Sequence, residues 1–149
     1  AKDVLNGLEV GDRIAIIGGG LVGCETADFL AERDKKVTIV EMLYEVATQM
    51  VIALRSLLIT RLTEKGVSIY TGIKCQEVTD DGLIIITKEG NIQTIEADNV
   101  VLASGDKSNT VLFESLKGEI SEIYCIGDCV EPRGIAEAVA DGYRVGLMI

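Results

Sequence analysis

The stretch that decides the fold is Arg13-Ile14-Ala15-Ile16-Ile17-Gly18-Gly19-Gly20-Leu21-Val22-Gly23-Cys24-Glu25. Residues 14–17 are apolar and rich in isoleucine, which predicts a strand buried on both faces of a parallel sheet. Gly18, Gly20 and Gly23 follow at the spacing G-x-G-x-x-G, and the residues after them have helical periodicity. The stretch therefore predicts a strand, a tight turn and a helix in immediate succession.

This arrangement is typical of dinucleotide-binding turns, in which each glycine has its own task. Gly18 permits the tight turn, Gly20 allows the backbone to approach a pyrophosphate, and Gly23 lets the helix pack close to the strand. The first N–H groups of the helix, and the positive end of its dipole, then face the phosphates. We therefore take the whole segment Gly18, Gly19, Gly20, Leu21, Val22 and Gly23 as the candidate phosphate-binding loop. A glycine-rich turn without a ligand is the alternative.

Glu41 ends the second predicted strand, residues 36–41, about twenty residues after the glycines. A carboxylate at this place accepts hydrogen bonds from both ribose hydroxyls of an adenosine and repels a 2′-phosphate. Residues 42–44 supply no arginine, and Lys35 and Lys36 lie at the far end of the strand. Glu41 therefore favours NADH over NADPH, unless it is merely a solvated residue at the end of a strand.

Composition limits the class of protein. The chain has 149 residues, of which 48% are hydrophobic and one is proline, as expected for a globular protein of about one domain. A formal net charge of −10 and the absence of histidine argue against nucleic acid or anionic membranes as partners. No apolar run reaches membrane length. Four scattered cysteines without a C-x-x-C motif predict no metal site and a reduced, cytoplasmic protein with Cys24 and Cys125 largely buried.

The remaining elements are predicted from periodicity and turn signals. A helix over 50–65 precedes a third parallel strand at 67–70, and a strand at 100–103 returns to the same sheet. Between them we expect three short antiparallel strands, a meander that replaces one crossover helix, at 73–79, 83–88 and 92–97. In the last third of the sequence we expect a helix over 109–116, a strand at 123–126 and a helix over 134–149. The fold class is thus a Rossmann-like parallel sheet with helices on both faces and an antiparallel meander.

These motifs together resemble the two-dinucleotide flavoprotein reductases, which include the pyridine nucleotide-disulfide oxidoreductases. Residues 18–25, GGGLVGCE, are similar to that family's NAD(P)H-binding motif, and the meander resembles its usual insertion. Residues 123–128, IYCIGD, resemble its second FAD motif. More narrowly, residues 40–42, 100–105 and 127–133 are similar to the C-terminal part of NADH:flavin oxidoreductases of the Old Yellow Enzyme type, such as 2,4-dienoyl-CoA and 2-enoate reductases.

The resemblance implies a role for each matching residue. Glu25 would lie near the nicotinamide carboxamide, with a plain surface acid as the alternative, and Gly105 would lie near the nicotinamide half of the ligand. Gly127 and Asp128 would serve FAD, whose ribityl chain donates a hydrogen bond to the aspartate. The expected organisation is a linker over 1–12, an NAD(H)-binding domain over 13–105 and a returning segment of an FAD domain over 106–149.

The resemblance also implies what this chain lacks. In that family electrons pass from NAD(P)H to FAD, then through an iron–sulfur cluster to FMN in an N-terminal barrel. The chain contains no second G-x-G-x-x-G, no cluster-binding cysteines and no barrel. We therefore expect a piece of a longer oxidoreductase whose partners are the other FAD half and the barrel. The small residues on the face of the helix over 134–149 also suggest a homo-oligomer.

Two functions of other classes are alternatives: a non-catalytic module that responds to NAD, and a methyltransferase, because S-adenosylmethionine sites also use glycine-rich turns. The predicted meander and the Gly127-Asp128 pair argue against a methyltransferase.

Overall fold

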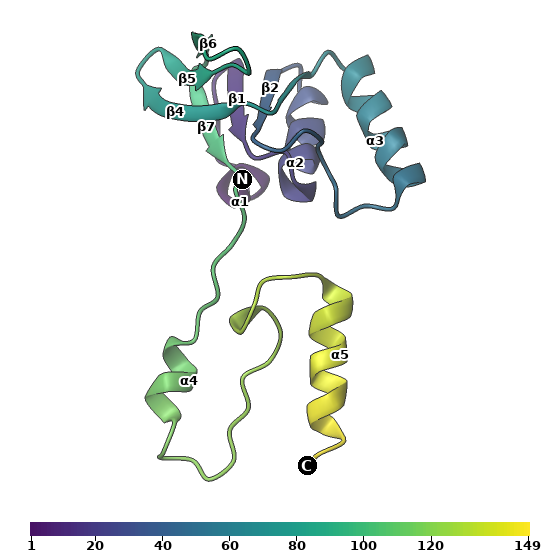
Figure 1. The fold of residues 1–149 in the computed structure, drawn as a ribbon, viewed down its shortest axis with the longest axis vertical. Coiled ribbons are helices and arrows are strands. Elements are labelled where there is room, and N and C mark those ends of the chain that lie inside the picture. Colours follow the sequence, from purple (N-terminus) through teal and green to yellow (C-terminus); the bar gives the residue numbers. More distant parts are fainter. The chain divides into compact units, whose positions relative to one another are not determined.

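Four parallel strands form a sheet around the glycine-rich turn, in the order β3-β2-β1-β7. The computed structural model describes residues 1–149, which form two compact units, residues 1–104 and 105–149. The elements of the first unit (Figure 1) are α1 (Lys2–Leu5), β1 (Arg13–Ile17), α2 (Leu21–Ala31), β2 (Lys36–Glu41), α3 (Ile52–Glu64), β3 (Ser68–Thr71), β4 (Lys74–Thr79), β5 (Gly82–Ile86), β6 (Ile92–Glu96) and β7 (Asn99–Leu102).

The two faces of the parallel sheet are covered by different layers. Ile14 and Ile16 of β1 are buried against apolar residues of α1, α2 and α3. Ala15, which points to the opposite face, packs against Leu83 and Ile85 of β5. Successive residues of a strand point to opposite faces, so the isoleucine-rich run is buried on both sides as the sequence predicts.

A second sheet, in the order β4-β5-β6, forms the layer opposite the helices. Its strands are antiparallel, and together they make the connection between β3 and β7. The predicted α/β sheet with an antiparallel meander in place of one crossover is therefore confirmed. The expectation of helices on both faces holds for one face only, because the meander occupies the other.

Residues 1–12, which the sequence predicts to be a linker, contain a helical turn. In this single turn, α1, Val4 is 6% exposed and belongs to the core beside α2. The amino group of Ala1 donates a hydrogen bond to the carbonyl oxygen of Leu102 at 3.0 Å. Arg13 is anchored to Asp98, whose carboxylate accepts hydrogen bonds from the backbone N–H (2.8 Å) and from the guanidinium of Arg13. The lead-in thus packs on the sheet.

The second unit contains α4 (Val111–Leu116), the short 3₁₀ helix η1 (Gly127–Cys129) and α5 (Ile135–Gly146). The strand predicted at 123–126 is absent. Ile126 has extended backbone angles (φ −142°, ψ 162°), but no neighbouring strand supplies a hydrogen-bonding ladder. The prediction that Cys125 is largely buried is also wrong, since its burial is intermediate. A strand needs a partner, and residues 105–149 offer only an isolated bridge between Lys117 and Ile120.

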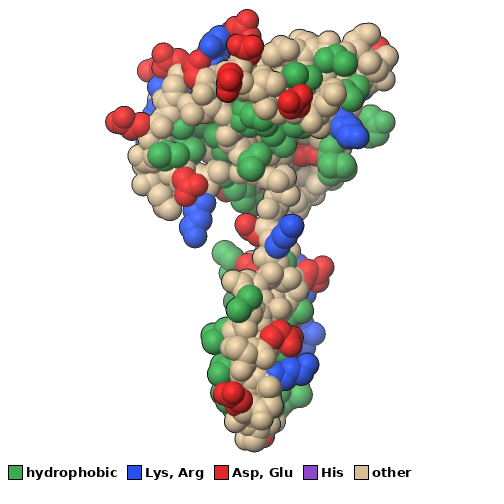
Figure 2. Space-filling model, turned by 90° about the vertical axis from the view of Figure 1, so that its left-hand side faces the viewer, with side chains coloured by type: hydrophobic (Ala, Val, Ile, Leu, Met, Phe, Trp, Pro, Cys, Tyr) green, Lys and Arg blue, Asp and Glu red, His purple; other side chains and the backbone are tan.

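Hydrophobic side chains are exposed on both units (Figure 2). On α5, Ile135, Val139 and Tyr143 recur every four residues and are 86%, 65% and 68% exposed. The small residues that the sequence places on one helical face have a partner within the unit, because Ala138 and Gly142 lie near Gly127 and Ile126. None of the helices combines the length and the apolar character that crossing a membrane requires.

Candidate functional site

The glycine turn joins β1 to α2 at the carboxyl end of the parallel sheet, where ligands of such sheets bind. Gly18 has φ +108°, a conformation that L side chains rarely adopt, and its N–H donates to the carbonyl oxygen of Val40 at 2.9 Å. A Cβ on Gly18 would collide with the carbonyl oxygen of Ala103, and a Cβ on Gly23 would collide with that of Gly18. Both positions therefore require glycine for the fold itself.

Gly20 differs from these two glycines because its surroundings are open. Its backbone angles (φ −65°, ψ −176°) suit any residue, and it is the N-cap of α2. The nearest atoms to a Cβ placed there belong to the side-chain amide of Gln49, at 3.8 and 3.9 Å. Folding alone does not demand glycine here, so the space above this backbone is free for a ligand.

Several N–H groups of the loop have no acceptor within the chain. The first hydrogen bond that α2 makes with its N-cap runs from the N–H of Cys24 to the carbonyl oxygen of Gly20, at 3.0 Å. The N–H groups of Gly20, Leu21 and Val22 make no hydrogen bond to other residues. These donors, with the positive end of the helix dipole, fit the two phosphates of a dinucleotide.

Glu41, at the end of β2, is 8% exposed and lies beside the loop. Its Oε2 accepts a hydrogen bond from the N–H of Gly19 at 2.6 Å, and its Oε1 accepts one from the N–H of Leu43 at 2.7 Å. A carboxylate has about four lone-pair sites, so both oxygens retain capacity for ribose hydroxyls. Glu41 thus fixes the loop and remains able to bind a ligand.

Residues 46–49 also shape the loop, although no sequence signal indicates it. The N–H of Ala47 donates to the carbonyl oxygen of Gly19 at 2.7 Å, with Ala47 itself at φ +49°. Val46 is buried so closely against Gly19 that a Cβ there would lie 2.5 Å from its Cγ1. Arg55 of α3 holds this segment by donating to the carbonyl oxygen of Val46 at 2.7 Å. No periodicity or motif marks these residues.

The remaining predicted residues of the first unit lie on the first turns of α2. Leu21 is half-buried, Val22 is 50% exposed and Glu25 is exposed.

Cys24 is buried behind the loop and donates a hydrogen bond to the carbonyl oxygen of Gly19 at 3.4 Å. Burial, with the nearby carboxylates of Glu41 and Glu25, raises the pKa of Cys24 to about 11, so this thiol stays neutral.

Gly105, Gly127 and Asp128 belong to the second unit. Gly105 has φ +93° and open surroundings. Gly127 has φ +63°, and its N–H donates to Oδ2 of Asp141 at 3.1 Å. Asp128 is exposed and accepts a hydrogen bond from the N–H of Arg133 at 3.2 Å, while its other oxygen makes no hydrogen bond within the chain. That free oxygen fits a donor such as a ribityl hydroxyl.

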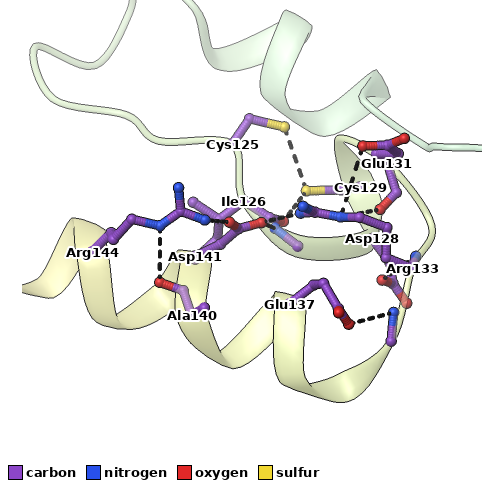
Figure 3. A network of polar contacts seen from close by, with 12 residues as sticks. Cys125, Ile126, Asp128, Cys129, Glu131, Arg133, Glu137, Ala140, Asp141 and Arg144 are labelled. Atoms are coloured by element: carbon purple, nitrogen blue, oxygen red, sulfur yellow. Dashed lines mark hydrogen bonds and ion pairs between the residues drawn. The ribbon is translucent and has the colours of Figure 1, made fainter. Parts of the chain in front are cut away.

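Asp141 of α5 holds the turn around η1 (Figure 3). It accepts the hydrogen bond from Gly127 and forms ion pairs with the guanidinium groups of Arg133 and Arg144. Burial alone would raise the pKa of Asp141, but the N–H of Gly127 and the guanidinium of Arg133 lower it overall. The Gly127-Asp128 turn is therefore anchored to the helix that follows it.

Comparison with known proteins agrees with these features. Residues 1–142 match the family model of the pyridine nucleotide-disulphide oxidoreductases. The chain is 38% identical over 153 residues to an NADH oxidase of Thermoanaerobacter brockii, with 100% of this chain and 24% of that protein covered. It is 34% identical over 153 residues to a cinnamate reductase of Clostridium sporogenes, with 100% of this chain and 23% of that protein covered.

Among solved structures, a 2-naphthoyl-CoA reductase superposes with a TM-score of 0.92 at 33% identity, over 99% of this chain and 23% of that one. The chain thus spans about a quarter of the length of the relatives that it matches. The match to the family model over nearly the whole chain confirms the resemblance inferred from residues 18–25 and 123–128. The chain belongs to the pyridine nucleotide-disulphide oxidoreductase family.

Proposed function

We propose that this chain binds NADH through the loop of residues 18–23 and delivers its hydride to FAD in a longer flavin-dependent oxidoreductase. The observation that carries the proposal is the combination of free N–H groups at Gly20, Leu21 and Val22 with the carboxylate of Glu41 beside them. The N–H groups suit the diphosphate, and Glu41 suits the hydroxyls of the adenine ribose.

Selection of NADH over NADPH follows from the charges near Glu41. A 2′-phosphate would meet a carboxylate that is 8% exposed and has no basic partner. Arg55, a nearby arginine, is already engaged by the carbonyl oxygen of Val46 and by Glu45. Like charges at short range repel strongly when they are partly buried, so the site favours the nucleotide without this phosphate.

The second unit carries the returning part of an FAD site in this proposal. The free carboxylate oxygen of Asp128 and the anchored Gly127 would hold the flavin's ribityl chain, and the N-terminus of α5 would direct its dipole toward the flavin. Glu25 would accept a hydrogen bond from the nicotinamide amide, and Gly105 would leave room for that half of the ligand. When bound, NADH supplies a hydride and FAD accepts it, so this chain's residues bind and orient and need not act as acid or base.

The names of the relatives support an enoate- or dienoyl-CoA-reductase-like activity for the complete protein, because cinnamate and 2-naphthoyl-CoA both carry conjugated double bonds. In this proposal residues 13–105 bind the nicotinamide nucleotide and residues 106–149 complete the FAD domain. FMN, an iron–sulfur cluster and the barrel would belong to the rest of the protein. The other FAD half would cover the exposed stripe Ile135, Val139 and Tyr143, or a second copy would do so in a homo-oligomer.

Calorimetric titration of the protein with NADH, NADPH, ADP-ribose and S-adenosylmethionine tests the proposal. Binding of NADH and ADP-ribose, with NADPH at least about tenfold weaker, is the expected result. Equal binding of NADH and NADPH would remove Glu41 as the selector. Binding of S-adenosylmethionine alone would overturn the proposed function. In the complete protein, flavin bleaching on anaerobic addition of NADH distinguishes hydride transfer from a purely NAD-responsive module.

A further inference from the structure

Cys125 and Cys129 in the second unit bring their sulfur atoms within 3.4 Å of each other (Figure 3). A disulfide bond is about 2.0 Å long, so the two sulfurs need to approach by only about 1.4 Å to be joined. Both cysteines are free and half-buried, and a small reagent can therefore reach them. Cys24, in contrast, is fully buried in the first unit.

The local backbone creates this proximity. Ile126 is extended, Gly127 turns the chain with φ +63°, and η1 then carries Cys129 back toward Cys125. The thiol of Cys129 donates to the carbonyl oxygen of Ile126 at 2.7 Å, so the hydrogen between the two sulfurs comes from Cys125. The hydrogen bond from Gly127 to Asp141 holds the turn in place.

We propose that Cys125 and Cys129 form a redox-active dithiol that closes to an intrachain disulfide by exchange with small-molecule disulfides. The thiolate of one cysteine attacks a sulfur of the small disulfide, and one small thiol leaves with a proton from solvent. The second cysteine then attacks the mixed disulfide and releases the second small thiol. Two protein thiols are oxidised to one disulfide, and one small disulfide is reduced to two thiols.

We assign the first attack to Cys129, because the thiol hydrogen of Cys125 is directed at the Cys129 sulfur. The hydrogen bond to Cys129 raises the pKa of Cys125, as do burial and the negative charge of Glu114. A thiol with a raised pKa has a smaller thiolate fraction and reacts more slowly. The sulfur of Cys125, which lies 3.4 Å from the sulfur of Cys129, is then positioned to attack the mixed disulfide at Cys129. The crosslink would enclose Gly127 and Asp128, so oxidation would restrain the turn that carries Asp128.

The test equilibrates the protein with defined ratios of reduced and oxidised dithiothreitol, followed by alkylation and mass spectrometry. Trypsin releases both cysteines in one peptide, residues 118–133, because Lys117 and Arg133 flank it and no basic residue lies between them. We expect this peptide to become resistant to alkylation and two hydrogen masses lighter as the ratio becomes oxidising. Cys24 and Cys75 should stay free thiols, so the alkylating reagent should modify both of them once the oxidised samples are unfolded.

The dithiol should oxidise more readily in the folded chain than in the chain unfolded in urea. The ratio of reduced to oxidised dithiothreitol at which half of the protein is oxidised should be roughly tenfold or more higher for the folded chain, which corresponds to about 30 mV for a two-electron couple. Incubated with oxidised glutathione, Cys125→Ser should accumulate a mixed disulfide at Cys129 that the wild-type protein does not retain. Cys75→Ser is the matched control and should keep the wild-type midpoint. Equal midpoints in the folded and unfolded chain, or a stable mixed disulfide on the wild-type protein, would overturn the proposal.

Discussion

Gly20→Ala separates the requirements of the fold from those of nucleotide binding. The backbone of Gly20 suits alanine, and a methyl group there would have no neighbour closer than 3.8 Å. Alanine is a poorer N-cap than glycine by about 1 kcal/mol, and this is offset by about 0.4–1 kcal/mol through the lower entropy of the unfolded chain. The free energy of unfolding should therefore change by less than about 1 kcal/mol.

Nucleotide binding should respond much more strongly. The methyl group would occupy the space above the free N–H groups of Gly20, Leu21 and Val22, where we place the diphosphate. A hydrogen bond to a charged group contributes about 1.5–3 kcal/mol, so each N–H···phosphate bond lost weakens binding roughly ten- to a hundredfold. Calorimetric titration with NADH measures the dissociation constant, and urea unfolding of the same preparation measures stability.

Gly146→Ala is the matched control, because Gly146 ends α5, has open space where a methyl group would point and belongs to the second unit. It should leave both NADH affinity and the unfolding of the first unit unchanged. If Gly20→Ala bound NADH as tightly as the wild-type protein, the loop would not hold the diphosphate, and the reasoning from its free N–H groups would be refuted.

Three further predictions concern the first unit, residues 1–104. Glu41→Gln should weaken NADH binding roughly ten- to a hundredfold and NADPH binding by less, as measured by parallel titrations; an unchanged ratio of the two affinities would exclude Glu41 from selection. Gly23→Ala should destabilise the first unit by about 1–3 kcal/mol or more in urea unfolding, because its methyl group would collide with the carbonyl oxygen of Gly18; wild-type stability would mean that the turn adjusts freely. Hydrogen bonds from Arg13 lower the pKa of Asp98 to about 2. The ionised carboxylate of Asp98 therefore contributes its full stabilisation of the fold above a pH of about 4, and this stabilisation is lost as the pH falls toward about 2. Asp98→Asn should therefore lower stability at pH 6 and flatten its dependence on pH below about 4, and parallel curves for variant and wild-type protein would contradict this assignment.

Local signals are sufficient to predict the central part of the fold. The strand predicted at 36–41 is observed as β2 with the same bounds, because it contains four consecutive β-branched residues, 37–40, which favour a strand inside a sheet. The glycine spacing locates the turn, since Gly18 and Gly23 serve needs of the backbone itself. The three strands of the meander are predicted from turn residues and lie within one or two residues of the expected bounds.

Features that depend on distant parts of the chain are not predictable in this way. Val46 and Ala47 reach the loop only because α3 and β2 place their segment over Gly19. The sequence of residues 123–126 is strand-like, yet no strand lies beside it in the second unit. The meeting of Cys125 with Cys129 depends on the positive φ of Gly127, which the C-x-x-x-C spacing alone does not reveal. Cytoplasmic location stays a prediction from the spacing of the cysteines.

Amide chemical shifts report most directly on the central claim that the glycine loop binds the diphosphate of NADH. In ¹⁵N-labelled protein, titration with NADH should shift the N–H signals of Gly20, Leu21 and Val22 most, together with that of Gly19, whose N–H is bonded to Glu41. The signals of β4–β6 should stay in place. A saturable titration that leaves these four signals unmoved and shifts residues elsewhere would contradict the account.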